Sequence, residues 1–346
     1  MIGGCGSSGT TLLRELISAH PGITCGPELS MLNKRRLYRQ PYEQTRREFA
    51  SYLEDGLPTT GILDLPWLPW SPSDFLRREL RFFEQSEDHG VARQAVLSMA
   101  QESASLRELL DRFFGEILHR SGSAWRWAEK TPSNCYCIGE FLALYPQGVY
   151  IHVVRDGRDV VPSLVKRGLS VPAAVRRWMY DTACGLPYMD HPRCYQVRYE
   201  ELVADPQACL EGLFAFLGEA LPEAATAGGA RPEMGGERKS GHASWTLQPG
   251  QQISSTASGK WKNGAYAEKD FIEQLFRYTR LSQTAAKALE MEALNGVELL
   301  QRCGYDPADG WNAQPGVGRT YFRHYLREKR GKDRPDGLDY FDVTLG

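Results

Sequence analysis

The sequence has no long hydrophobic run and no excess of charge of either sign. No window of about 18 unbroken apolar residues occurs, which excludes a transmembrane helix. The 41 basic and 43 acidic residues give a net charge of −2, which argues against a nucleic-acid partner, although a local basic patch stays open. No basic stretch followed by an apolar stretch opens the chain, so we predict no secretory leader.

Cysteine is also scarce, with eight residues in a chain of 346. That density is too low for a disulfide framework. Cys135 and Cys137 form a CxC pair with no second pair nearby. We therefore predict reduced thiols that pack in the interior of a cytoplasmic protein. A hydrophobic share of 42% and a charged share of 24% are typical of a folded globular chain and exclude a disordered one.

Short strands alternate with amphipathic helices along most of the chain. Strands are expected near the N-terminus, where we expect a few further upstream residues to belong to the strand, and at 23–25, 125–129, 148–154 and 195–198. Helices are expected at 12–20, 106–119, 135–145, 159–167, 171–189 and 206–217, and through most of 271–303. This order predicts an α/β fold with a P-loop-type parallel β-sheet flanked by helices.

The predicted domain organisation is one α/β domain over 1–310. A mostly helical insertion is expected at about 35–120, and a C-terminal tail at 311–346. The stretch 219–260 is rich in Gly, Ala, Ser and Pro and is predicted to be loop-like.

A glycine-rich loop lies between the first strand and the first helix. Gly4 and Gly9 have the spacing of a phosphate-binding GxxxxGK[ST] loop, with Thr10 in place of the lysine. Backbone N–H groups of such a loop, and the N-terminal end of the next helix, bind anions. A triphosphate with Mg²⁺ would lack its lysine, so the loop predicts a smaller anion such as a 5′-phosphate. A purely structural glycine turn is the alternative.

The most apolar strand ends in the sequence VVRDGRDVVPS, which supplies two arginines and a serine. Arg155 and Arg158 flank the strand-to-helix turn, and Ser163 follows on the helix. Arginine suits bidentate phosphate contact, and ligands of open α/β sheets lie beyond the carboxyl ends of strands. Asp156 and Asp159 could instead neutralise both arginines in an ion-paired turn.

Two further motifs follow predicted strands. The sequence EKTPSN places Lys130 at a strand end, where it could point into the same cleft, although a single lysine is ordinarily a solvated surface residue. The sequence VRYEELVADP reads as a strand-to-helix junction in which Asp205 caps a helix beginning at Pro206. No His, Cys or Asp cluster has the spacing of a metal site, so no metal is predicted.

In this order, the segments SSGTTLLRELISAHP, CGPE, EKTPSN, VRDGRDVVPSLVKR, VRYEELVADP and SGKWKN resemble the sulfotransferases that use PAPS, 3′-phosphoadenosine 5′-phosphosulfate. The likeness is nearest to the branch of tyrosylprotein sulfotransferases and bacterial small-molecule and carbohydrate sulfotransferases. It spans roughly 1–30 and 125–305. The resemblance implies PAPS as cosubstrate, a hydroxyl as acceptor, and a sulfate ester and adenosine 3′,5′-bisphosphate as products.

The resemblance also implies a catalytic pair. Glu28 would be the general base, and Lys130 would stabilise charge on the transferring group. This fits the chemistry, because a carboxylate can remove the proton of a hydroxyl that attacks sulfur. An ammonium and loop amides can neutralise the leaving phosphate oxygen without a metal. A helix-capping glutamate is the alternative reading of Glu28.

The donor contacts are likewise implied by the resemblance. The loop residues Gly6, Ser7, Ser8, Gly9, Thr10 and Thr11 would hold the 5′-phosphosulfate. The others are Arg155, Ser163 and Arg167 for the 3′-phosphate, Tyr199 for the adenine, Lys260 and Trp261 for closing the nucleotide site, and Ser254 or Ser255 for the donor. Ser7 departs from the family pattern, which has arginine or lysine there, and Lys130 is the candidate substitute for the lost charge.

The acceptor is predicted to be a small-molecule, lipid or carbohydrate hydroxyl, with a peptide tyrosine also open. It would bind to the insertion, with Trp67 and Trp70 as candidate contacts, for which hydrophobic packing is the alternative. Two other functions remain: a P-loop small-molecule kinase using ATP, disfavoured by Thr10, and a non-catalytic nucleotide-binding protein, favoured only by Ser7. The oligomeric state stays open.

Overall fold

The computed structural model describes residues 1–55, 86–226, 258–263 and 269–308. Its strands are β1 (Ile2–Gly4), β2 (Ile23–Cys25), β3 (Arg126–Ala128), β4 (Tyr150–Val154) and β5 (Cys194–Arg198). Strands β1, β4 and β5 form one parallel sheet in the order β1-β4-β5, and β2 pairs with β3 in a second parallel sheet. A parallel bridge between Ile2 and Lys130 joins the two sheets. The predicted parallel α/β fold is confirmed.

Both faces of the larger sheet are buried, as the apolar run in β4 predicts. Successive side chains of a strand point to opposite faces. Accordingly, Ile151 and Val153 belong to one hydrophobic core, and Tyr150 and Val154 belong to the other.

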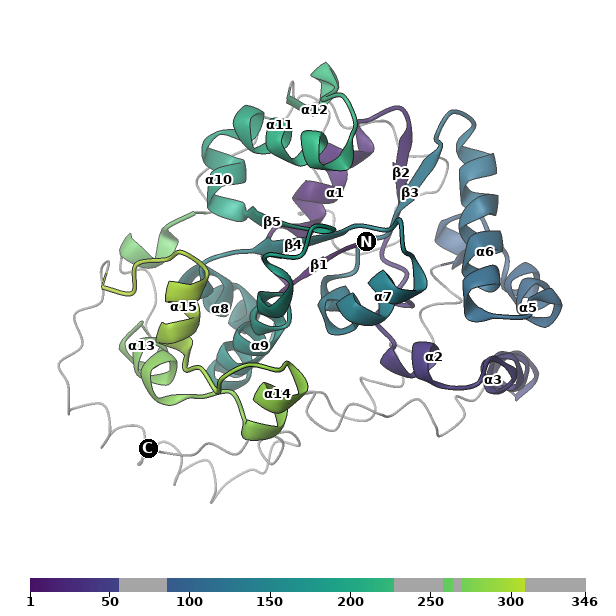
Figure 1. Ribbon diagram of the computed structural model, residues 1–346. Helices are drawn as coiled ribbons and strands as arrows, with labels where there is room; N and C mark the ends of the chain where they lie inside the picture. The colour runs from purple at the N-terminus through teal and green to yellow at the C-terminus, as the bar shows by residue number, and fades with distance from the viewer. Residues whose placement is uncertain (56–85, 227–257, 264–268, 309–346) are drawn as a thin grey trace.

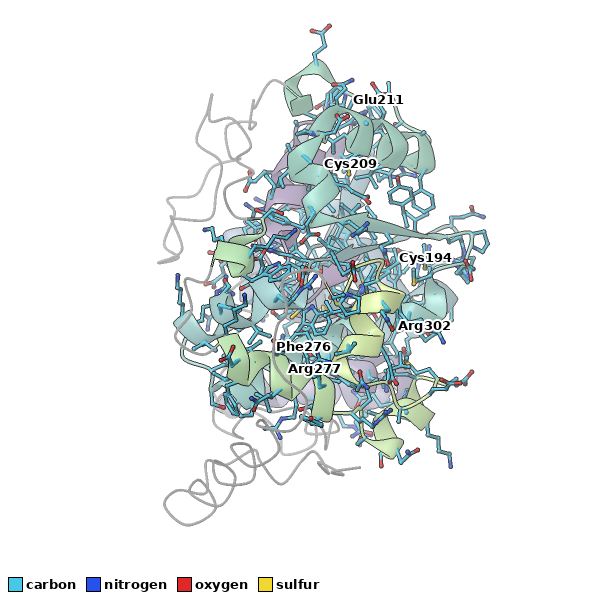
Figure 2. The ribbon with its side chains drawn as sticks, turned by 90° about the vertical axis from the view of Figure 1, so that its left-hand side faces the viewer. Cys194, Cys209, Glu211, Phe276, Arg277 and Arg302 are labelled. Carbon is cyan, nitrogen blue, oxygen red and sulfur yellow. The ribbon has the colours of Figure 1, made fainter. Side chains whose placement is uncertain are left out.

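A different set of helices covers each face. Helices α1 (Thr10–Ser18), α10 (Tyr199–Ala204) and α11 (Pro206–Leu217) supply one core. Helices α7 (Ile138–Leu144), α8 (Gly157–Lys166), α9 (Val171–Ala183), α13 (Lys269–Tyr278) and α15 (Gly296–Arg302) supply the other. Figure 1 shows the two groups on opposite sides of the strands. Figure 2 shows the same separation, with Cys209 on α11 and Phe276 on α13.

The described part of the 35–120 segment is largely helical. It contains α2 (Arg35–Arg39), α3 (Tyr42–Asp55), α5 (Arg93–Glu102) and α6 (Leu106–Ser121). Helix α6 buries the apolar face that its sequence predicts, and the Ser105 side chain accepts a hydrogen bond from the Glu108 N–H at its start. Trp67 and Trp70 lie outside the described residues.

The predicted helix 171–189 is wrong at its C-terminal end. Helix α9 ends at Ala183, and a 3₁₀ turn follows at Leu186–Tyr188. Between them, a Cβ on Gly185 would lie 2.4 Å from the Nε2 atom of His152. The chain therefore turns where it meets the core of the sheet, a contact that helix periodicity does not reveal.

Other predicted helix boundaries also shift. The segment 271–303 is three helices, α13, α14 (Gln283–Ala288) and α15, because Ser282 caps α14 and Asn295 forms a capping box at α15. Residues 135–145 begin as a 3₁₀ turn at Pro132–Cys137 before α7. Helix α8 starts two residues earlier than predicted, since Asp156 accepts a hydrogen bond from the Arg158 N–H.

All eight cysteines lie within the described residues, and each is a free thiol. Six of them are buried. Within the described residues, no helix is both long and apolar enough to span a bilayer.

Candidate active site

The five strands within the described residues all end at the same edge, and each is followed by a predicted site residue. The glycine loop follows β1, Glu28 follows β2 and Lys130 follows β3. Arg155 follows β4, and Tyr199 follows β5. Because parallel strands place their carboxyl ends together, segments far apart in the sequence meet here.

The glycine loop leaves the start of α1 open. Gly9 precedes the helix with φ of 91°, and no side chain caps the first turn. A Cβ on Gly9 would lie 2.3 Å from the Tyr199 ring, so the position tolerates only glycine in this packing. The uncapped N–H groups of α1 therefore remain available for an anion.

Two loop hydroxyls have no partner. The Oγ atoms of Ser7 and Ser8 are buried without a hydrogen bond in the described structure. Ser7 also has a φ of 70°, which is uncommon for a residue with a side chain. Buried polar groups normally have a hydrogen-bond partner, so these hydroxyls fit a bound anion such as the 5′-phosphosulfate group.

Lys130 joins the loop to the predicted base. Its Nζ atom lies 2.5 Å from Oε1 of Glu28 and donates to Oγ1 of Thr11 at 3.2 Å. The Lys130 side chain is 2% exposed, whereas that of Glu28 is 41% exposed. A buried ammonium is thus held beside a more accessible carboxylate and the first turn of α1. The surface-lysine alternative for Lys130 is wrong.

Arg155 also reaches the glycine loop. Its Nη1 atom donates to the backbone oxygen of Ser7 at 2.9 Å, and its guanidinium lies 4.3 Å from the centre of the Tyr199 ring. The Trp178 indole donates to the Arg155 carbonyl at 3.0 Å and holds its backbone. The strand-end arginine and the phosphate loop are therefore in direct contact.

The ion-paired alternative holds in part for Arg155, whose Nη2 atom lies 3.9 Å from Oδ2 of Asp159. The neighbouring Arg158 follows it more closely. Its guanidinium makes hydrogen bonds of 2.7–3.0 Å to both carboxylate oxygens of Asp156. It also donates to the Asp306 carbonyl at 3.0 Å and lies 3.7 Å from the centre of the Trp261 ring. Arg158 thus connects the turn after β4 to Trp261 and to Asp306.

Asp159 anchors the segment that contains Lys260 and Trp261. Its carboxylate accepts from the Gly259 N–H at 2.7 Å and the Trp261 N–H at 3.2 Å. Trp261 is buried, whereas Lys260 is exposed. We call residues 258–263 the strap. The sequence indicated Asp159 only as a possible ion-pair partner. Nothing in the residues around Asp159 predicts its hydrogen bonds to the backbone of the strap, about 100 residues later.

The remaining predicted donor residues lie around these groups. Tyr199 is buried against Gly9 and Arg155. Ser163 is half-buried in α8, and the next side chain on that helix, Leu164, lies 3.8 Å from where a Cβ on Gly6 would be. Ser254 and Ser255 lie outside the described residues.

Arg167 directly follows α8, on the side of the predicted base Glu28. Burial lowers the pKa of Arg167 below its usual value, and the Glu28 carboxylate partly opposes that shift. The two side chains therefore interact electrostatically. The sequence did not predict this pairing.

His89 is a site neighbour that the sequence did not single out. Burial lowers its pKa to about 4, so the ring is neutral at pH 7. Its Nε2 atom lies 3.0 Å from the Pro27 carbonyl, one residue before Glu28, and must carry the proton to donate there. A Cβ on Gly26 would lie 2.2 Å from the ring, which explains the glycine. Within the described residues, no cluster of three or more His, Cys, Asp or Glu could hold a metal ion.

Comparison with known proteins places this arrangement in a family. The sulfotransferase family model matches residues 1–223. Protein-tyrosine sulfotransferase 2 of Gallus gallus is 25% identical over 232 residues, which cover 63% of this chain and 50% of that protein. The omega-hydroxy-beta-dihydromenaquinone-9 sulfotransferase of Mycobacterium bovis is 30% identical over 107 residues, covering 26% and 28%. The chain spans about half the length of the first curated relatives it matches.

A solved structure shares the fold. The sulfotransferase domain of the Synechococcus PCC 7002 olefin synthase aligns with a TM-score of 0.51 and 21% identity, covering 80% of this chain and 93% of that domain. The family-model match over residues 1–223, which is more than half of the sequence, shows that the chain belongs to the sulfotransferase family.

Proposed function

We propose that the protein transfers a sulfuryl group from PAPS to an acceptor hydroxyl. The observation that carries this proposal is the position of the Lys130 ammonium, which contacts both the Glu28 carboxylate and Thr11 at the start of the phosphate-binding helix. A cation in this place can neutralise a leaving phosphate oxygen while a carboxylate beside it takes up a proton.

The donor would lie along the carboxyl edge of the strands. The open N-terminus of α1 and the Ser7 and Ser8 hydroxyls would hold the 5′-phosphosulfate, and Lys130 would supply the charge that Ser7 lacks. Arg155 and Ser163 would hold the 3′-phosphate, with Arg167 as a further cation. The order of these residues along the edge supports a nucleotide with phosphates at both the 3′ and 5′ positions of its ribose.

Other residues would bind the nucleoside and close the site. Tyr199 would contact the adenine, and Lys260 and Trp261 would cover the nucleotide from the strap, with Ser254 or Ser255 bonding the donor. The hydrogen bonds of Asp159 to the strap support this closing role, because they fix Trp261 against α8.

In the proposed reaction, Glu28 takes the proton of the acceptor hydroxyl. The acceptor oxygen forms a bond to sulfur, and the bond between sulfur and the bridging phosphate oxygen breaks. The electron pair of the broken bond stays on that oxygen, where Lys130 and the loop N–H groups stabilise it. The products are a sulfate ester and adenosine 3′,5′-bisphosphate.

The Glu28–Lys130 pair has a second consequence. A buried ammonium requires an anion in contact with it, and Glu28 supplies one in the unliganded protein. When the donor supplies negative charge, Lys130 can transfer its contact to the phosphosulfate. Glu28, at 41% exposure, is then available to the acceptor.

The acceptor would approach from the helices of the 35–120 insertion within the 1–310 unit. The acceptor class is a small-molecule, lipid or carbohydrate hydroxyl, or a tyrosine. The relatives named above are a protein-tyrosine sulfotransferase and a menaquinone-derivative sulfotransferase, which supports a hydroxyl in either kind of molecule.

A transfer assay tests the proposal. The full chain is incubated with PAPS and a panel of phenol, sugar, lipid-alcohol and tyrosine-peptide acceptors, and released adenosine 3′,5′-bisphosphate is measured. We expect turnover with at least one acceptor. Glu28→Gln and Lys130→Ala should each lower kcat about 100- to 1,000-fold while bisphosphate binding persists.

Matched controls are Glu211→Gln and Lys287→Ala. Glu211 lies on α11 (Figure 2), and Lys287 lies near the end of α14; both are exposed. Neither control should alter kcat. A chain that binds the bisphosphate but transfers nothing to any acceptor would be the non-catalytic alternative, and unchanged kcat in both site variants would refute the assigned roles.

A further inference from the structure

The two residues that flank Lys130 accept hydrogen bonds from the two residues that follow Glu28. The Leu29 N–H donates to Oε1 of Glu129 at 3.1 Å. The Ser30 N–H donates to Oγ1 of Thr131 at 3.1 Å. The segment 129–131 and the segment 28–30 are therefore connected by two consecutive hydrogen bonds beside the Lys130–Glu28 pair. We call these two bonds the clamp.

The geometry of an extended chain explains why the clamp and the pair coexist. Thr131 has extended backbone angles, and Lys130, beyond the end of β3, forms a parallel bridge with Ile2 of β1. Side chains at alternate positions of an extended segment point the same way. Glu129 and Thr131 thus project together toward the backbone of residues 28–30, which we call the base loop, while Lys130 projects toward Thr11 and the Glu28 carboxylate.

A buried hydrogen-bond network holds the clamp, in which Oδ1 of Asn134 is the one side-chain oxygen that has no hydrogen bond within the described residues. The Thr131 hydroxyl donates to Oε1 of Glu129 at 2.5 Å, so its lone pair is left to accept from Ser30. Asn134 donates to Oε2 of Glu129 and to the Ile2 carbonyl. The side chains of Glu129, Thr131 and Asn134 are all buried. Networks of this kind fix one arrangement, because a buried polar group that loses its partner is strongly penalised.

Burial of the Glu129 carboxyl group carries a cost. Burial raises its pKa above the usual value, and the hydrogen bonds from Thr131, Asn134 and the Leu29 N–H oppose that shift. An apolar residue would avoid the desolvation penalty. A carboxyl group here instead accepts three hydrogen bonds, one of them from the Leu29 N–H that directly follows Glu28.

The base loop itself is strained. Ser30 has a φ of 51°, in the left-handed region that residues with side chains seldom occupy. Such strain persists only where the surroundings impose it. The Ser30 N–H bond to Thr131 and the buried Leu29 side chain supply that restraint two residues after a half-exposed Glu28.

We propose that Thr131 and Glu129 are positioning residues that hold the Glu28 carboxylate against the Lys130 ammonium. This inference rests on the proposed sulfuryl transfer. Base and cation act on the same reacting group, and a displacement of about 1 Å can lower a rate about 100-fold. The clamp fixes their separation through the backbone on both sides.

The decisive variants are Thr131→Val, which keeps the shape and removes the hydroxyl, and Thr131→Ser, which restores it. In Thr131→Val we expect kcat to fall 10- to 100-fold. The KM for PAPS and the Kd for adenosine 3′,5′-bisphosphate should change less than threefold. Thr131→Ser should return kcat to within threefold of the unmodified protein. Thr279→Val, which alters a buried threonine after α13, is the control for general destabilisation.

A crystal structure of Thr131→Val gives a readout that does not depend on activity. We expect the Lys130 Nζ to Glu28 Oε1 distance to exceed 3.5 Å, compared with 2.5 Å here. If Thr131→Val does not fold, Glu129→Gln replaces it in both measurements. A kcat within threefold, a fall that Thr131→Ser does not reverse, or an unmoved pair overturns the inference. If the unmodified protein transfers nothing, the proposed function fails instead, and the crystal structure still decides the clamp.

Discussion

Lys130 illustrates what the sequence can and cannot say about a single side chain. Its position after a predicted strand placed it near the cleft, but only the structure shows a 2% exposed ammonium between Glu28 and Thr11. Arg155 and Arg158 lie three residues apart; their residue types alone did not distinguish them, and only the family resemblance selected Arg155. In the structure, Arg155 contacts the glycine loop and Arg158 contacts Asp156. The sequence does not reveal this difference, because the first contact joins residues far apart in the chain and the second depends on side-chain rotamers.

His152 gives a prediction about stability and pH. Burial lowers its pKa to about 4, against 6.5 in an unfolded chain. As the pH falls below 6.5, His152 is protonated in the unfolded chain but stays neutral in the folded chain. The free energy of unfolding therefore decreases. Between pH 7.5 and 5 this group should remove about 2 kcal/mol from the free energy of unfolding.

Urea unfolding of the unmodified protein and of His152→Gln at the two pH values measures this effect. The variant should show a loss smaller by about 2 kcal/mol. Glu129 and Asp181 have raised pKa values and act in the opposite direction, but both proteins contain them, so the difference isolates His152. Equal losses in the two proteins would contradict the assignment.

The sequence predicted the strands and the helix after the glycine loop close to their observed positions. It predicted the ends of several other helices less accurately. Strand β4 was predicted at 148–154 and is observed at Tyr150–Val154, because a β-branched run buried on both faces has few other interpretations. The breaks around α14 depend on the caps at Ser282 and Asn295, which helix periodicity overlooks. The end of α9 depends on the contact between Gly185 and His152, which no local pattern encodes.

The strap gives a prediction at the same scale. Asp159 holds it through two backbone N–H groups, and Asp159→Asn retains only one acceptor oxygen. Loss of one such bond is worth about 1 kcal/mol. We therefore expect the affinity for adenosine 3′,5′-bisphosphate, measured by titration calorimetry, to fall about fivefold, with kcat at saturating PAPS much less affected.

Asp205→Asn is the matched control for this measurement. Asp205 caps α11 by accepting a hydrogen bond from the Ala208 N–H, and asparagine caps equally well. Its affinity for the bisphosphate should not change. If Asp159→Asn binds as tightly as the control, the strap does not contribute to nucleotide binding.

At the scale of the whole molecule, one feature organises both fold and site: five parallel strand ends meet at one edge. The alternation of strands and helices predicts a parallel sheet, and therefore that the motifs after each strand lie together. It does not predict that the sheet divides into β1-β4-β5 and β2-β3, joined by the Ile2–Lys130 bridge. That division depends on the pairing of strands separated by the helical insertion.

The sequence indicated which motifs meet at this edge better than it indicated the contacts that support them. Short motifs carry the glycine loop, Glu28, Lys130 and Arg155. The clamp from Glu129 and Thr131 joins positions about 100 residues apart, and nothing in either local sequence indicates the other. Hydrogen bonds between residues so far apart in the chain become evident only in the folded structure.

The central proposal is that the strand-end edge described above binds an adenosine with phosphates at both the 3′ and 5′ positions. Calorimetric titration of the full chain with adenosine 3′,5′-bisphosphate, adenosine 5′-monophosphate and ATP–Mg²⁺ tests it most directly. We expect one bisphosphate per chain, bound at least tenfold more tightly than the monophosphate, with Arg155→Ala abolishing that difference because a charge-assisted bond to the 3′-phosphate is lost. Binding of ATP–Mg²⁺ without binding of the bisphosphate would contradict the account.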